Sequence, residues 1–284
     1  MFSKSFSTNQ ETIHPNNIYR QIERDYKFQG ALTRHSYYPL DVGNILYSHC
    51  TRNNILSSLT KDEVAIVKNP IATKTNAAQR KNMVMNWFDI FDKMFFFGNL
   101  RKEINGIDFE DDELVEELNV VGAYDPTENH IFINIHEEKT LELKKYLTLV
   151  HQSYEEYFIC VLFHEMTHAF ISTYCCVCRP CRKIRQSITL GGDGRQGHGP
   201  LWADAMARMQ VILQNLVKWN VNSCIDDSVR EEMEFNKWEP SPSQLSRWGI
   251  TRPRIPGKLT AADLPSRVTV HRTPRRCTPR RRMR

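Results

Sequence analysis

The feature that most constrains this chain is the long run Tyr154–Tyr174, which has no glycine or proline and contains the motif HEMTH at 164–168. Apolar residues recur along it at helical spacing, and further apolar residues occupy its other faces. The sequence therefore predicts a helix that is buried almost all round. Residues four apart lie above one another on a helix, so His164 and His168 should point the same way.

This spacing suits a metal site, because two imidazole nitrogens one helical turn apart can bind the same tetrahedral zinc ion. Glu165 lies next to that face, where it could take a proton from a water on the metal. The alternative is a pair of ordinary surface histidines, since HExxH arises by chance in roughly one per cent of chains of this length. Buried and unpaired polar groups would be costly in so apolar a helix, so we favour the metal site.

A catalytic zinc ion needs a third protein ligand if water is to take the fourth position. The metzincin pattern would place glycine at 171 and histidine at 174, where this chain has Ile171 and Tyr174. A thermolysin-like glutamate is absent from the next predicted helix, Leu201–Trp219. His198 is the best candidate, because the glycines on either side of it allow close backbone approach and the helix that follows would hold the turn.

These residues resemble those of a known family. HEMTHAF at 164–170, followed by GHGPLW at 197–202, resembles the SprT-like (Spartan-type) zinc metalloprotease domain. MFFFGNL and VVGAYDPTENHIFINI are similar to the end of that family's preceding helix and to its hairpin. The resemblance covers roughly residues 41–220. It implies an α+β, zincin-like fold in which His164, His168 and His198 bind Zn²⁺ and Glu165 is the general base.

The resemblance also implies a role for the protein. It implies a zinc metalloendopeptidase that acts on DNA-bound or DNA-crosslinked proteins in DNA repair, in the nucleus or also in the cytoplasm, with DNA as activator. The segment between His168 and His198 is longer than in compact members, and no ubiquitin-binding zinc finger of recognisable spacing follows. Two alternatives stay open: a DNA-associated adaptor with a structural metal site, and a zinc protease unrelated to nucleic acid.

The rest of the chain predicts one α+β domain between two tails. We expect a loose N-terminal arm over 1–40, the metalloprotease domain over 41–221, and a proline-rich, disordered tail over 222–284. A capped turn and linker are expected at 60–75 and a loop at 175–199. Further helices are predicted at Asp41–Leu59, Ala77–Phe97, Thr140–Leu149 and Leu201–Trp219.

Two alternating segments, 120–124 and 131–136, are separated by residues of turn composition, which predicts an antiparallel hairpin within a small antiparallel sheet. The strand Ile131–Ile135 could pair with an extended peptide substrate.

Positive charge is concentrated at the C-terminal end. The formal net charge is +5, but seven arginines and no acid lie within 272–284, and 31 Lys and Arg face 33 Asp and Glu elsewhere. This tail could contact DNA phosphates without sequence preference, act as a nuclear import signal, or have no specific partner. No apolar run approaches membrane-spanning length and the first residues lack the apolar core of a secretion signal. We therefore expect a soluble intracellular monomer with protein substrates.

Four of the eight cysteines crowd together after the HEMTH helix: Cys175, Cys176, Cys178 and Cys181. In a reducing compartment such a cluster favours metal binding or free thiols over disulfides. The adjacent pair Cys175 and Cys176 makes an awkward contribution to a four-ligand zinc site. A second metal, free thiols and a local crosslink all remain open from the sequence.

Overall fold

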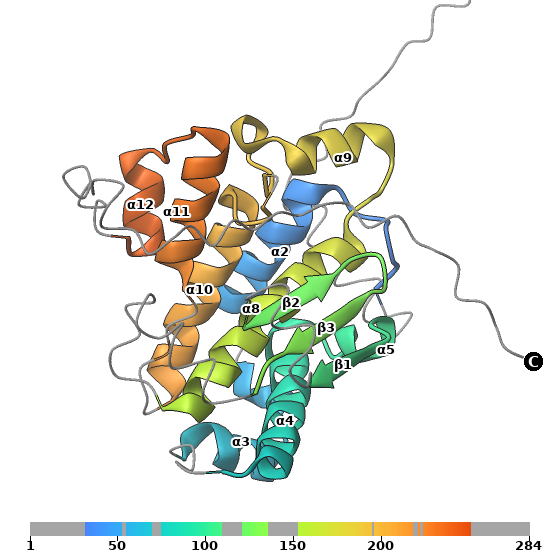
Figure 1. Ribbon diagram of the computed structural model, residues 1–284, viewed down its shortest axis with the longest axis vertical. Helices are drawn as coiled ribbons and strands as arrows, with labels where there is room; N and C mark the ends of the chain where they lie inside the picture. Colours follow the sequence, from blue (N-terminus) through green and yellow to red (C-terminus); the bar gives the residue numbers. More distant parts are fainter. Residues whose placement is uncertain are drawn as a thin grey trace, which may run out of the picture.

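The computed structural model describes residues 32–52, 55–69, 75–109, 121–135, 153–194, 196–217, 221 and 224–250. Within these ranges the fold is α+β and mostly helical (Figure 1). The helices are α2 (Pro39–Arg52), η1 (Ile55–Ser58), α3 (Lys61–Lys68), α4 (Ala77–Phe95), α5 (Leu100–Glu103), α8 (Tyr154–Tyr174), α9 (Arg179–Gln186), η2 (Ile188–Leu190), α10 (Pro200–Leu216), α11 (Ile225–Asn236) and α12 (Pro242–Trp248). The strands are β1 (Gly106–Phe109), β2 (Gly122–Asp125) and β3 (His130–Ile133).

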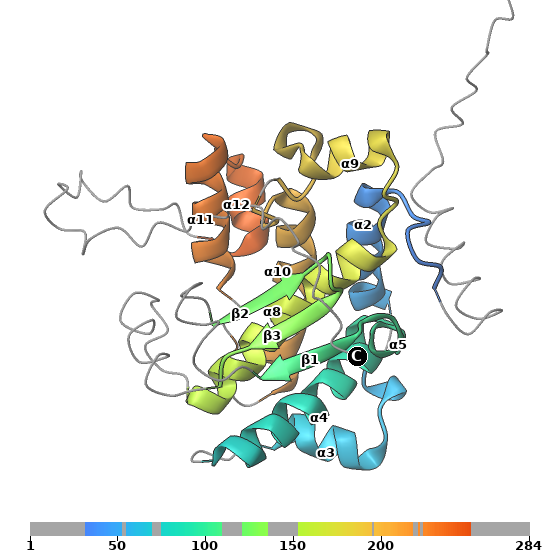
Figure 2. The same cartoon turned by 45° about the vertical axis from the view of Figure 1, so that its right-hand side comes forward.

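Helix α8 lies at the centre of the fold and has the bounds that the sequence predicts. At its start, the Ser153 side chain accepts the N–H of Glu156 at 3.1 Å, and the Glu156 carboxylate accepts the N–H of Ser153 at 3.2 Å. The sheet covers one side of α8, while α2, α4 and α10 pack on its other sides (Figures 1 and 2). Most of its side chains are buried, which explains why nearly every face is apolar.

The aromatic residues of α4 form a core with α8. The ring of Phe163 lies 4.8 Å from that of Phe91, 5.3 Å from Phe95 and 6.3 Å from Phe96, measured between ring centroids. Aromatic pairs of this kind contribute about 0.5–1.5 kcal/mol each beyond the area that they bury. Gly98 follows with a φ of +65°, a conformation that glycine adopts without strain and that turns the chain after α4.

The sheet is mixed, with strand order β1-β3-β2. β2 and β3 form the predicted antiparallel hairpin, with Gly122 opposite Ile133. β1 instead runs parallel to β3, with Gly106 opposite His130, so the expected all-antiparallel sheet is wrong. Four residues are too few to show a clear period in the sequence, which is why β1 was not predicted.

The folded region continues past residue 221, because α11 and α12 pack against α10 (Figures 1 and 2). Arg247 donates two hydrogen bonds to the Asp204 carboxylate of α10, at 2.7 and 2.9 Å, and the indole of Trp248 donates a third. The expected disordered tail is therefore wrong for residues 225–250. These helices are mostly polar, and their few buried residues include the polar Ser228 and Glu232, so their apolar pattern is weak.

Two shorter segments also differ from expectation. The linker expected at 60–75 contains α3, which Thr60 caps through the N–H of Glu63. The loop expected at 175–199 contains α9 and η2. The end of the expected arm is ordered, since the N–H groups of His35 and Tyr37 donate to carbonyls at the end of α8. Residues 1–31, the helix predicted at Thr140–Leu149 and the tail from residue 251 lie outside the described residues.

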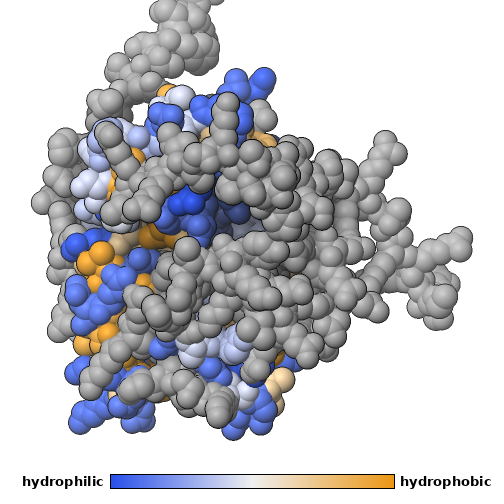
Figure 3. Space-filling model, turned by 60° about the vertical axis from the view of Figure 1, so that its left-hand side comes forward, coloured by the Kyte–Doolittle hydropathy of each residue, from blue (hydrophilic) through white to orange (hydrophobic). Residues whose placement is uncertain are grey.

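On the face shown in Figure 3, hydrophobic residues lie interspersed with hydrophilic ones along one edge. Among the residues that the structure places, no helix combines the length and hydropathy needed to cross a membrane.

Candidate metal centre

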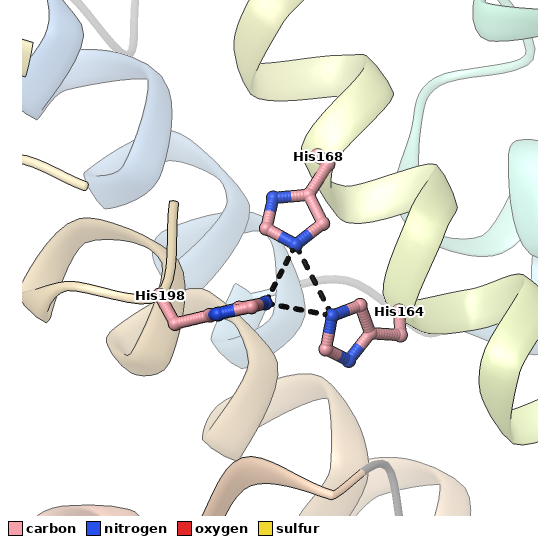
Figure 4. Close-up of side chains that lie close together, drawn as sticks. All are labelled: His164, His168 and His198. Atoms are coloured by element: carbon pink, nitrogen blue, oxygen red, sulfur yellow. Dashed lines mark hydrogen bonds between the residues drawn. The ribbon is translucent and has the colours of Figure 1, made fainter. Parts of the chain in front are cut away.

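Three histidine side chains meet at one point between α8 and the turn before α10 (Figure 4). The Nε2 atom of His164 lies 3.0 Å from that of His198 and 3.1 Å from that of His168, and the Nε2 atoms of His168 and His198 are 3.1 Å apart. The helix places the first two one turn apart, as predicted. The turn places the third opposite them, so all three residues chosen from the sequence come together.

Hydrogen bonding between the three rings cannot account for this triangle. Each imidazole nitrogen carries either a proton or a lone pair, never both. For any choice of tautomers, at least one of the three contacts therefore joins two protons or two lone pairs and is repulsive. A cation at the centre would instead accept a lone pair from each of the three nitrogen atoms.

The distances fit zinc. Two nitrogens bound to one tetrahedral zinc ion at about 2.05 Å lie about 3.3 Å apart, close to the 3.0–3.1 Å found here. All three side chains are partly exposed, so an ion and a further ligand can reach the site from solvent. The donor set is three neutral nitrogens, which suits zinc better than the oxygen-seeking ions calcium and magnesium.

Trp202 in the first turn of α10 fixes the three rings. Its indole stacks on His168 with an interplanar angle of 13° and lies 4.6 Å from the ring of His164 and 4.8 Å from that of His198. It is fully buried. Bulky packing of this kind restricts the rotamers of the ligands and so preorganises the site.

Glu232 of α11 holds the turn that carries His198. Its carboxylate accepts the backbone N–H of His198 at 3.1 Å and that of Gln196 at 3.3 Å, and the side-chain amide of Asn236 donates to it. Glu232 is fully buried. Gly194 has a φ of +78°, and a Cβ there would lie 2.1 Å from the Glu232 carboxylate. Glycine at this position is therefore required for the carboxylate to reach the turn.

A second buried acid, Asp193, joins the same turn to α9. Asp193 accepts the Nε–H of Arg185 at 3.0 Å, and its backbone carbonyl accepts the N–H of Gly199 at 2.6 Å. Burial raises the pKa of the Asp193 carboxyl to about 6, the Arg185 charge opposes this shift, and Glu232 adds to it. The ion pair thus links α9 to the residues on both sides of His198.

Glu165, the neighbour of His164 on α8, is 7% exposed. Gly122 of β2 packs against it: a Cβ at this position would lie 2.4 Å from Cγ1 of Val161 and 3.2 Å from Cγ of Glu165. Only glycine therefore lets β2 lie this close to α8. The first strand residue of β2 borders the proposed general base.

The substrate strand expected from the sequence is not available. β3 is hydrogen-bonded to β1 on one side and to β2 on the other, so Ile131–Ile135 cannot receive a substrate strand over the paired residues. β2 lies at the edge of the sheet and, within the described ranges, is paired with β3 alone. Gly122, the first residue of this strand, is the one that packs against Glu165.

Sequence reasoning missed the residues that support the ligands: Gly122, Arg185, Asp193 and Glu232. Glu232 lies in a segment expected to be disordered, and a single glycine or acid carries no periodic signal. Gly194 lies in the glycine-rich stretch before His198, which signals close backbone approach but not the group that approaches.

No protein-family model, curated protein or solved structure matches this chain. The described residues form an α+β structure with a candidate metal centre.

Proposed function

We propose that this protein is a zinc-dependent endopeptidase of the SprT-like, zincin-like type. The observation that carries the proposal is the convergence of three Nε2 atoms, from His164, His168 and His198, with Glu165 next to His164 on the same helix. Structural zinc sites usually have four protein ligands, whereas catalytic sites have three and leave a position for water. The three-histidine set favours catalysis over a structural role.

The zinc ion, Glu165 and β2 would each have a separate role in peptide hydrolysis. A bound zinc ion supplies Lewis acidity and lowers the pKa of water to about 7. Glu165 takes a proton from the attacking water and later delivers it to the leaving amine of the cleaved peptide. The edge of β2 offers backbone hydrogen bonds to an extended substrate and so orients its scissile bond near Glu165.

For the substrate we propose proteins that are bound or crosslinked to DNA, in the nucleus or also in the cytoplasm. The support is the resemblance of the motifs at 164–170 and 197–202 to SprT-like domains, together with the seven arginines at 272–284. Arginine-rich segments bind phosphates without sequence preference. The protein would then act on substrates that are bound to the same DNA molecule as itself.

The test is cleavage of a DNA-binding protein by zinc-loaded wild type and by Glu165→Gln, each with and without single-stranded DNA. Glu165→Gln should keep its zinc and lose at least about 10²-fold in turnover, because general acid–base groups contribute that much or more. Glu234→Gln on the exposed side of α11 is the matched control and should remain active.

Each other outcome excludes part of the proposal. Activity in Glu165→Gln would exclude Glu165 as the base. A zinc-loaded wild type that cleaves nothing would favour the adaptor with a structural metal site. Cleavage that ignores DNA would favour a zinc protease unrelated to nucleic acid.

A further inference from the structure

Three thiols lie close together where the chain leaves α8 and enters α9. The sulfur atoms of Cys176, Cys178 and Cys181 all lie within 4.8 Å of one another. Cys178 is the residue that precedes α9, and Cys181 lies in the first turn of that helix. Two sulfurs bound to one tetrahedral zinc at about 2.3 Å lie about 3.8 Å apart. The thiols therefore need to approach by at most about 1 Å, and the exposed side chain of Cys178 is free to turn inward.

Metal ions bind the thiolate form of cysteine. The backbone N–H of Cys181 and the neighbouring thiols lower the pKa of the Cys178 thiol, whereas burial and the neighbouring thiols raise the pKa of Cys181 to about 12. The N–H of Cys178 in turn points at the sulfur of Cys176 at 3.5 Å. Helix α9 also directs the positive end of its dipole at the cluster.

Helix α9 adds formal positive charge. Its eight residues include four cations, and the sequence RPCRKIRQ has no acid. Arg182 reaches back to donate to the carbonyl of Val177 at 3.4 Å, within the segment that carries the thiols. Three thiolates and a divalent ion carry a net charge of −1, which these neighbouring cations would offset.

The backbone beneath the cluster is already fixed. The N–H of Cys176 donates to the carbonyl of Tyr37 at 2.7 Å, and the N–H of Tyr37 donates to the carbonyl of Tyr174 at 3.1 Å. Cys181 is 8% exposed. The fold thus holds the backbone of Cys176 and the buried side chain of Cys181 in place, and the exposed Cys178 closes the site from the solvent side.

We propose that Cys176, Cys178 and Cys181 bind a second zinc ion, separate from the three-histidine site, with solvent in the fourth position. The adjacent Cys175 is not part of this group, which removes the difficulty of two neighbouring cysteines on one ion. The inference does not depend on whether the protein is a protease.

The second site would stabilise the first one from a distance. It joins the end of α8 to the start of α9, and Arg185 on α9 holds Asp193 at 3.0 Å. The carbonyl of Asp193 accepts the N–H of Gly199, next to His198. An ion on the thiols therefore restrains the helix from which the His198 turn is supported.

The test is to titrate the reduced, full-length protein with Co²⁺ and then to measure its zinc content. The wild type should bind two equivalents and show thiolate-to-cobalt charge-transfer absorption, which histidine ligands do not give. Replacing Cys176, Cys178 and Cys181 together by serine should abolish that absorption and one equivalent of metal. His198→Ala should do the opposite, weakening the histidine site and keeping the charge-transfer band.

Two further variants guard against misfolding as the explanation. Cys178→Ser changes one exposed side chain and should lower cobalt affinity at the thiol site by at least about tenfold. Cys224→Ser, outside the cluster, should change neither the band nor the stoichiometry. Zinc should also protect three of the eight cysteines from a thiol reagent. Absence of the charge-transfer band in wild type, its persistence in the triple variant, or equal thiol reactivity with and without zinc would each overturn the proposal.

Discussion

Glu232 gives the sharpest test of how the fold supports the histidine site. It lies on α11 and accepts two backbone N–H groups of the turn that carries His198. Glu232→Ala removes both acceptors and leaves the two part-buried N–H groups without this carboxylate. The turn should then sample conformations in which His198 no longer faces α8.

The magnitude follows from the two hydrogen bonds. Each bond to a charged group contributes about 1.5–3 kcal/mol, so the substitution removes about 3–6 kcal/mol of gross interaction. Only the part that holds the turn in its metal-binding conformation affects zinc affinity. Loss of a group that orients a metal ligand typically costs about 10–100-fold in affinity, or about 1.4–2.7 kcal/mol. The remainder should lower the free energy of unfolding of the metal-free protein.

Zinc affinity is measured by competition with a chromophoric chelator, and unfolding by urea titration of the metal-free protein. Glu234→Ala, an exposed acid on the same helix, is the control and should leave both quantities unchanged. In a His198→Ala background, Glu232→Ala should cause no further loss of zinc affinity, because the ligand that it positions is already absent. A folded Glu232→Ala protein with wild-type zinc affinity would refute the reasoning.

Three other predictions follow from the structure. Gly122→Val should displace β2 from α8, lower the free energy of unfolding by about 1–3 kcal/mol and slow peptide cleavage. The zinc content should stay unchanged, because no proposed ligand lies on β2, and loss of zinc would contradict this. Burial raises the pKa of the Asp92 carboxyl to about 6, so the folded state binds this proton more tightly than the unfolded chain. Stability should therefore fall by about 3 kcal/mol as pH rises from about 4 to 7, and Asp92→Asn should flatten that dependence in urea unfolding. Deleting residues 272–284 should make the slope of log affinity for single-stranded DNA against log salt concentration shallower by at most about 5, the value for seven arginines. Cleavage of an unstructured peptide should be unchanged. Equal slopes for the full-length and shortened proteins would exclude the tail as a DNA tether.

The sequence determined the central helix and the residues of the candidate metal centre. A long apolar segment without glycine or proline predicts a buried helix, and the spacing of His164 and His168 then fixes their common face. His198 was found because its flanking glycines mark a place of close backbone approach. The hairpin was found for a similar reason, since its period of two and its turn residues are local signals.

Only the tertiary structure decided which groups support these residues. The parallel pairing of β1 with β3, the contact of Gly122 with Glu165 and the hydrogen bonds of Glu232 all join segments far apart in the sequence. None of these contacts leaves a periodic signal, because each depends on a single residue and on a partner that local propensity does not specify.

The same reasoning explains the two polar helices after α10. Helices α11 and α12 bury few apolar residues, and the polar segment that contains them predicts disorder when it is considered alone. They are stabilised by α10, through the pairing of Arg247 with Asp204 and the burial of Trp248. A short helix gains most of its stability from tertiary packing, so its existence is decided by the surface on which it packs.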